Sequence, residues 1–247
     1  MKTIAIDNGH GKFTAGKRTP AFPNGQQIRE WEFNYPTAKK VGHLLKHNGF
    51  KVIYVSDTEN DTPLRTRTDR ANSQGVDLYV SIHYNALTGR WGSQNGIETF
   101  YWKTSNEGKR LAKLIQSNLI QFTGLHDRGI KTSNLHVLRE TRMTSILVEC
   151  GFMDNLKEAN LMLDESYQWK CAKAIVKGIC EYYNQPFKDN EQSDKSTIKI
   201  KLHGEPKVIE GFKKDRVNYV PIRFLEQLGY KIGWDDKTET VLIGYKG

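Results

Sequence analysis

The sequence predicts an α/β layered domain followed by a small α+β unit. In the first 184 residues, short apolar segments alternate with longer segments whose apolar residues recur at helical spacing, a pattern typical of α/β domains. A polar stretch, NQPFKDNEQSDKS, then interrupts both periods and indicates a linker. The predicted parts are a first domain over residues 1–184, a linker over 185–196 and a second domain over 197–247.

Six segments of the first domain have the composition of buried strands. Each is short and rich in Ile, Val, Tyr or Phe, the residues that favour strands. The predicted strands cover residues 3–7, 51–55, 78–83, 97–102, 135–138 and 146–149.

Three segments between these strands carry apolar residues on one helical stripe. The first predicted helix covers residues 33–45, with Gly49 as its stop signal. The other two cover residues 108–122 and 167–183. Helices of this length between short strands suit the layered arrangement.

The last fifty or so residues have their own pattern. Two strands are predicted around Gly204–Pro206, and a helix over residues 220–230 ends at Gly229. Two further strands are predicted over residues 231–234 and 240–243, on either side of a turn-like DDK segment. A module of this size is marginal by itself.

Composition narrows the function classes. Hydrophobic residues make up 37% of the 247 residues and charged residues 26%, which favours a globular chain over a disordered one. No segment approaches the roughly 20 apolar residues of a membrane helix, so no membrane insertion is expected. The net charge of +9 favours anionic partners. Without a basic run or a nucleic-acid-binding motif, the anionic polymers of a bacterial wall are preferred to nucleic acid.

The amino-terminal segment bears on localisation. Its apolar run stops at Ile6 and is followed by Asp7, whereas a secretory signal needs about 7–15 apolar residues. No secretory signal is therefore expected, and a substrate outside the cell would require another route of release.

Three predicted strands end in residues that can carry chemistry. His10 follows the first strand between Gly9 and Gly11, while His83 and Glu149 each end another strand. Because the carboxyl ends of strands in α/β sheets face the ligand crevice, these side chains are expected to converge.

Two histidines and one carboxylate are a common catalytic zinc set. Near the start of the first helix, Glu30 or Glu32 could supply that carboxylate, and Glu149 could take a proton from water. Serine hydrolysis through Ser81 and His83 is disfavoured because no nucleophile elbow is present. Elsewhere, His126 is assigned a structural role, and Asp127 with Arg128 a local pair.

Five ordered motifs carry a resemblance to a known family. The segments IAIDNGHGK, NGQQIREWEFN, SIHYNA, GIETFYW and ILVECGFMDN resemble those of the zinc-dependent N-acetylmuramoyl-L-alanine amidases of bacterial autolysins and phage endolysins. The resemblance covers residues 1–184. It implies a three-layer domain with a mixed sheet of about six strands between helices. It also implies hydrolysis of the amide between the lactyl group of N-acetylmuramic acid and L-alanine of the stem peptide of peptidoglycan. Together with the missing secretory signal, the resemblance favours a phage endolysin, made in the cytoplasm and acting on the cell wall after release by lysis or through a holin-type pore.

The resemblance also assigns roles to individual residues. The His of the GHG motif is His10, the Glu of the E-x-x-x-N motif is Glu30, and the His of the S-I-H-x-N motif is His83. These three are the expected ligands of one Zn²⁺ ion. Glu32 lacks an Asn four positions later. The Glu of the L-V-E-x-G-F motif, Glu149, is the expected catalytic carboxylate.

The second domain resembles the stalk-like domain named after the N-terminal domain of copper amine oxidase. The motifs VPIRFLEQLG, WDD and VLI carry this resemblance, and no copper site is implied. From Asp194 onward there are 11 basic and 8 acidic residues. Cell-wall targeting is the expected role, with a folding or dimerisation element as the alternative.

Two other functions stay open at this stage. One is a zinc peptidase that acts on wall peptides with the same metal site. The other is a wall-binding protein without catalytic activity, which the presence of Glu149 argues against. The sequence predicts no oligomeric state.

Overall fold

The computed structural model describes residues 1–189, 195–202, 205–214, 217–219, 225–226, 229–235 and 240–245. The chain divides into two compact units, Met1–Asn190 and Glu191–Gly247. Among the described residues, no helix combines the length and the apolarity needed to cross a membrane.

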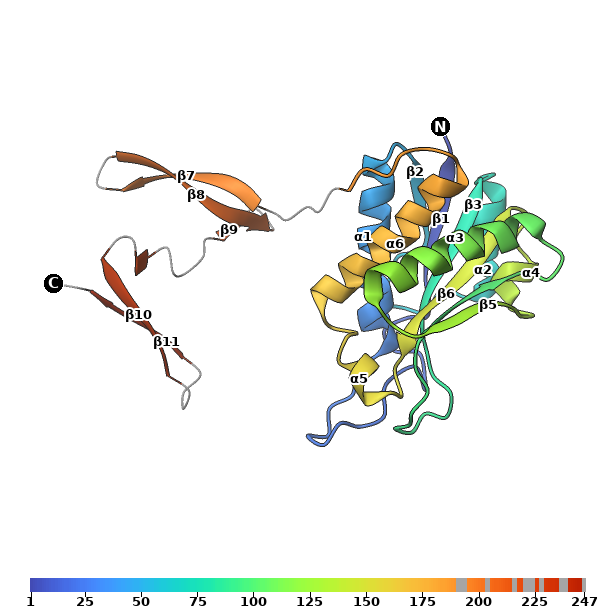
Figure 1. Cartoon of the computed structure of the whole chain (residues 1–247), viewed down its shortest axis with the longest axis horizontal. Coiled ribbons are helices and arrows are strands. Elements are labelled where there is room, and N and C mark those ends of the chain that lie inside the picture. The colour runs from blue at the N-terminus through green and yellow to red at the C-terminus, as the bar shows by residue number, and fades with distance from the viewer. Residues whose placement is uncertain are drawn as a thin grey trace. The chain divides into compact units, whose positions relative to one another are not determined.

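A mixed six-stranded sheet forms the centre of the first unit (Figure 1). Its strand order is β2-β1-β3-β6-β4-β5. The first four strands in this order are parallel, whereas β4 is antiparallel to β6 and parallel to β5. The strands are β1 (Thr3–Asn8), β2 (Lys51–Ser56), β3 (Leu78–Asn85), β4 (Ile97–Tyr101), β5 (Asp127–Thr132) and β6 (Thr144–Phe152).

Helices cover both faces of this sheet (Figure 1). One face packs against α1 (Glu30–His47), α3 (Asn106–Thr123) and α6 (Glu165–Tyr182), and the larger apolar cluster lies between them. The other face packs against α2 (Leu64–Ser73) and α4 (His136–Arg139) through a smaller cluster. The short α5 (Leu156–Ala159) follows β6. The predicted three-layer α/β fold with a mixed sheet is therefore confirmed.

One predicted strand is wrong, and one strand of the sheet was not predicted. The segment over residues 135–138 was predicted as a strand, but His136–Arg139 is the helix α4. The edge strand is instead β5, Asp127–Thr132, which contains Gly129 at a φ of 76°. The segment Leu-His-Val-Leu is too short to show either a twofold or a 3.6-residue period, so its pattern could not distinguish a strand from a helix.

The second unit contains two small antiparallel sheets. One consists of β7 (Lys195–Leu202), β8 (Glu205–Lys214) and β9 (Val217–Tyr219), and the other of β10 (Tyr230–Asp235) and β11 (Thr240–Tyr245). Strands β7, β8, β10 and β11 lie where strands were predicted. The helix predicted over residues 220–230 lies largely outside the described residues.

Candidate active site

The candidate residues meet at one edge of the sheet. Strands β1, β3 and β6 are parallel neighbours, so His10, His83 and Glu149 all lie at their carboxyl ends. In the register of β3 and β6, His83 pairs directly with Glu149. The convergence predicted from the three strand ends is thus present in the fold.

The loop after β1 places His10 through an unusual backbone. His10 has a φ of 58°, a conformation that non-glycine residues rarely adopt and that clusters at functional sites. A Cβ atom at Gly9 would lie 2.2 Å from Cε1 of His83, and one at Gly11 would lie 2.3 Å from the backbone nitrogen of Asp61. Glycine at position 9 therefore lets the loop approach His83, and glycine at position 11 lets it approach the backbone of Asp61.

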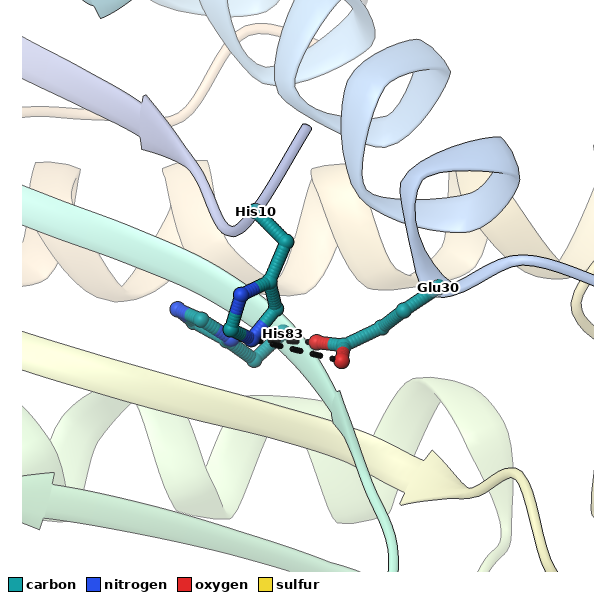
Figure 2. A group of neighbouring side chains, drawn as sticks. All are labelled: His10, Glu30 and His83. Carbon is teal, nitrogen blue, oxygen red and sulfur yellow. Dashed lines mark hydrogen bonds and ion pairs between the residues drawn. The ribbon is translucent and has the colours of Figure 1, made fainter. Parts of the chain in front are cut away.

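Three side chains point toward one another in a single cluster (Figure 2). Glu30 Oε1 lies 3.0 Å from His83 Nδ1, and Glu30 Oε2 lies 3.4 Å from His10 Nε2. One ligand atom from each of the three residues lies within 4.8 Å of the other two. The cluster draws on the loop after β1, the first turn of α1 and strand β3.

The two candidate glutamates in the first turn of α1 have different partners. The carboxylate of Glu32 accepts a hydrogen bond from the backbone N–H of Arg29 at 2.7 Å, so Glu32 caps the helix. Glu30 faces the histidines, and its Oε1 accepts hydrogen bonds from Asn34 Nδ2 at 3.0 Å and from Tyr84 N at 3.1 Å. Asn34 also donates to the carbonyl of Gly9, so the E-x-x-x-N spacing holds both the carboxylate and the His10 loop.

Electrostatics favour the ligand forms of His10 and Glu30. Burial, against the attraction of Glu30, lowers the pKa of His10 to about 4, so this imidazole is neutral at pH 7. Burial opposes ionisation of Glu30, but the hydrogen bond and charge of His83 outweigh it and lower its pKa to about 2. Burial opposes protonation of His83, but the hydrogen bond and the charge of Glu30 outweigh it and raise the pKa of His83. A neutral imidazole and an ionised carboxylate are the states that bind metal.

Glu149 differs from the other residues of the site. Its Oε2 atom is buried and has no hydrogen-bond partner. Burial raises the pKa of Glu149 to about 8, against the attraction of His83. A carboxyl group that titrates near neutral pH can take up and release a proton under working conditions.

A chain of hydrogen bonds that the sequence did not predict links His83 to Ser81, Asp7 and Arg67. Ser81 Oγ lies 3.1 Å from His83 Nε2 and donates to Asp7 Oδ2 at 2.7 Å. Arg67 Nη1 pairs with Asp7 at 2.5 Å, and both side chains are at most 2% exposed. Because Ser81 is fully buried, it cannot reach a substrate as a nucleophile. Its hydroxyl instead orients the imidazole, as hydrogen-bond partners of metal-binding histidines do.

Another buried carboxylate, that of Glu98, lies on the side of Glu149 away from His83. Glu98 on β4 pairs with Glu149 in the antiparallel register of β4 and β6. Its Oε2 accepts hydrogen bonds from Arg128 Nε at 2.7 Å and from Lys131 Nζ, and its Oε1 accepts one from Asn85 Nδ2 at 2.8 Å. The local pair predicted between Asp127 and Arg128 is wrong, because the Arg128 guanidinium bonds to Glu98.

The donor set of the cluster fits a zinc ion. Two imidazole nitrogens and one carboxylate oxygen are typical ligands of catalytic Zn²⁺, and three protein ligands leave a coordination position open. The unpartnered oxygen of Glu149 adds a proton acceptor at the same sheet edge. Among the described residues, this is the one group of His, Cys, Asp and Glu side chains close enough to share an ion.

Comparison with known proteins decides the family. Residues 4–181 match the family model described as N-acetylmuramoyl-L-alanine amidase. The chain belongs to this amidase family. The family membership confirms the peptidoglycan amidase function expected from the motifs, and peptidoglycan as the partner.

Individual relatives of the amidase agree. It is 38% identical over 186 residues to the N-acetylmuramoyl-L-alanine amidase LytC of Bacillus subtilis, with 74% of this chain and 36% of LytC covered. It is 33% identical over 207 residues to the endolysin of Bacillus phage SPP1, with 80% and 72% covered. A crystal structure of N-acetylmuramoyl-L-alanine amidase from Clostridium difficile 630 superposes with a TM-score of 0.67 at 34% identity, covering 74% of this chain and 97% of that one. The chain thus spans only about a third of LytC.

Proposed function

We propose that this amidase is zinc-dependent and cleaves the amide between the lactyl group of N-acetylmuramic acid and L-alanine of the stem peptide. In this proposal His10, Glu30 and His83 hold one Zn²⁺ ion, and Glu149 is the catalytic carboxylate. The observation that carries the proposal is the cluster of three ligand atoms within 4.8 Å, next to a carboxylate with an unpartnered oxygen.

The chain's own residues supply binding and proton transfer. When bound, zinc supplies Lewis-acid activation of the amide carbonyl and of the attacking water. Glu149 accepts a proton from that water and delivers it to the nitrogen of L-alanine as the amide bond breaks. In the metal-free protein, burial raises the pKa of Glu149 to about 8. The positive charge of a bound ion would lower this pKa and favour the ionised form, which accepts the proton.

Asn34 and Ser81 fix the cluster before a metal arrives. Asn34 holds the Glu30 carboxylate and the carbonyl of Gly9, and Ser81 holds the imidazole of His83. Their hydrogen bonds keep three ligands from different elements in one orientation, which lowers the entropic cost of forming the centre.

Metal analysis coupled to lysis of purified cell walls tests the proposal. The parent is expected to contain one zinc per chain and to release new amino groups of L-alanine. Glu149→Gln is expected to retain zinc and to lose at least about a hundredfold in turnover, since general acid–base catalysis contributes 10²–10⁴-fold. His10→Ala is expected to lose both. Full lytic activity after thorough removal of metal would refute the zinc dependence.

The same assay separates two other functions. A zinc peptidase would release amino groups from residues other than L-alanine. A wall-binding protein without activity would bind walls and release none. The pairing of a metal-binding set with the buried oxygen of Glu149 favours the amidase over the second alternative.

For the second unit, we propose cell-wall targeting. Its excess of basic residues suits the anionic polymers of the wall, and a tethered wall-binding module raises the effective concentration of substrate. Removal of residues 191–247 is expected to reduce pelleting of the protein with purified walls while turnover of small soluble muropeptides persists. Unchanged pelleting of the shortened chain would leave folding or dimerisation as its role.

A further inference from the structure

A cluster with excess positive charge lies beside the catalytic edge of the sheet. Glu98 carries one negative charge, and both Arg128 and Lys131 donate to its Oε2. Burial opposes ionisation of Glu98, but these two cations outweigh it and lower its pKa. With Glu98 ionised, the three side chains together carry one unbalanced positive charge.

The cations of this cluster remain accessible, whereas its anion does not. The side chain of Glu98 is 6% exposed, that of Arg128 30% and that of Lys131 40%. Arg128 is held in place by Glu98 and by the ring of Phe152, whose centroid lies 4.7 Å from its Cζ. A fixed guanidinium that is partly open to solvent is well suited to bind a carboxylate through paired hydrogen bonds.

Arg128 also lines a cavity of about 420 Å³, a volume in the range of small-ligand sites. The lining residues come from the loop that follows β3 and from the segment that enters β5: Leu87, Ser93, Gln94, Asn95, His126 and Arg128. The first of these segments leaves β3 just after His83. The cavity is therefore lined partly by the loop that continues the strand of His83, and it includes the guanidinium of Arg128.

The distance from this cation to the reacting amide suits a short peptide. Glu149 lies on β6, and Arg128 lies two strands away on β5. At roughly 4.8 Å per strand, the backbones of these two strands are about 10 Å apart. Two extended residues span about 7 Å, and a glutamate side chain adds a few ångströms. If L-alanine lies at Glu149, the acidic groups of the next residue reach Arg128.

From this geometry we infer that Arg128, with Lys131, binds a carboxylate of the stem-peptide residue that follows L-alanine. Glu98 acts as a positioning residue that holds both cations. The inference rests on the proposed function, since it assumes that the amide of L-alanine lies beside Glu149. It makes the amidase selective for stem peptides whose second residue is a free acid over those in which it is an amide.

Two muropeptides test this selectivity by binding. One is N-acetylmuramoyl-L-alanyl-D-glutamate, and the other is the same compound with both glutamate carboxylates converted to amides. Calorimetric titration uses the full chain carrying Glu149→Gln, so that neither ligand is consumed. The acid is expected to bind at least about tenfold more tightly than the diamide, as a charge-assisted hydrogen-bond pair would give.

Variants in the same background locate the preference. Arg128→Gln is expected to bring the ratio of the two dissociation constants close to one, and Lys131→Gln to reduce it partly. Arg65→Gln is the matched control, because Arg65 lies on α2 with its side chain 88% exposed, and it is expected to keep the full ratio. Thermal unfolding of each variant verifies the fold, and Arg128→Lys, with an intermediate ratio expected, replaces Arg128→Gln if that variant does not fold.

Equal affinity for both compounds in the Glu149→Gln protein, or an undiminished preference after both Arg128 and Lys131 are changed, would overturn the inference. The proposed function fails by a different result. Parent enzyme that releases no amino groups of L-alanine from walls would refute the amidase activity, whatever the binding preference proves to be.

Discussion

Two buried glutamates, Glu30 and Glu98, lie on either side of Glu149, and different groups compensate their negative charges. Glu30 is surrounded by two imidazoles, an amide and a backbone N–H. Glu98 is bound by a guanidinium and an ammonium group, with an amide on its other oxygen. Their side chains are similarly buried, at 2% and 6% exposed.

The difference lies in the source of the compensating charge. Burying a carboxylate is costly unless a cation or hydrogen bonds compensate it. Glu98 has permanent cations from the chain itself. At Glu30 the compensating charge must come from a proton on His83 or from a metal ion, and these compete because a protonated imidazole cannot bind metal. The exchangeable counter-charge at Glu30 supports the proposal that its cluster takes up a metal ion.

The same substitution at both glutamates gives the largest expected contrast. Glu30→Gln is expected to lower zinc affinity and turnover by more than about a hundredfold, since loss of a hydrogen-bond partner of a ligand alone costs 10–100-fold. Glu98→Gln is expected to leave zinc content unchanged. Zinc titration against a chromogenic chelator measures both. Equal zinc loss in the two variants would contradict the assignment of Glu30, and not Glu98, to the metal centre.

Removal of a single hydroxyl sharpens the contrast on the metal side. Ser81→Ala deletes the bond to His83 Nε2 while Asp7 keeps its pair with Arg67. The expected result is a 10- to 100-fold weaker zinc affinity. The melting temperature of the metal-free protein is expected to stay close to that of the parent. Ser145→Ala, at a buried serine on the same sheet whose Oγ donates to the carbonyl of Leu138, serves as control. Unchanged affinity in Ser81→Ala would show that the hydroxyl does not orient the ligand.

At Glu98, the partner of Arg128 and Lys131, substitution is expected to lower the free energy of unfolding. Glu98→Gln leaves Arg128 and Lys131 without their shared anion, and the estimated loss is about 1–3 kcal/mol in the free energy of unfolding. Water reaches both cations, which limits the loss. Urea unfolding of the metal-free proteins measures it. Added salt is expected to narrow the gap between variant and parent, because it screens the repulsion of the two cations.

A pH dependence is expected at Glu149, whose Oε2 has no hydrogen-bond partner. Its folded pKa of about 8 lies above the ordinary value, so the folded state binds the proton more tightly than the unfolded one. That stabilisation is complete below about pH 4 and is lost as the pH rises toward 8. The melting temperature of the metal-free parent, relative to Glu149→Gln, is expected to fall by several degrees between pH 5 and pH 8.5. Parallel curves would contradict the raised pKa.

Sequence reasoning was most successful where chemistry and strand ends coincide. His10, His83 and Glu149 each follow or end an apolar run, and parallel strands bring such ends together. Glu30 was separable from Glu32 only through the resemblance. The structure adds the physical reason, since Glu32 is occupied in capping the helix.

Helix α2, strand β5 and the pairing of Glu98 with Arg128 could not be predicted from the local sequence. Helix α2, LRTRTDRANS, has almost no apolar stripe, because the side chains that it buries include Arg67 and Thr68. Strand β5, DRGIKT, has one glycine and three charged residues among its six positions, so its composition did not predict a strand. Glu98 and Arg128 lie 30 residues apart, and only the sheet order makes them partners.

The reversal of chain direction between β6 and β4 has a consequence for how the enzyme tolerates insertions and deletions. Glu98 stands opposite Glu149 because of one register, and adjacent residues of a strand face opposite sides of the sheet. A slip of β4 by one position would bring Thr99 to that place and send Glu98 to the opposite layer. Changes in the length of the 86–96 loop can be absorbed before β4 begins, whereas a single deletion within Ile97–Tyr101 would dismantle the charge arrangement without touching any proposed ligand of the metal.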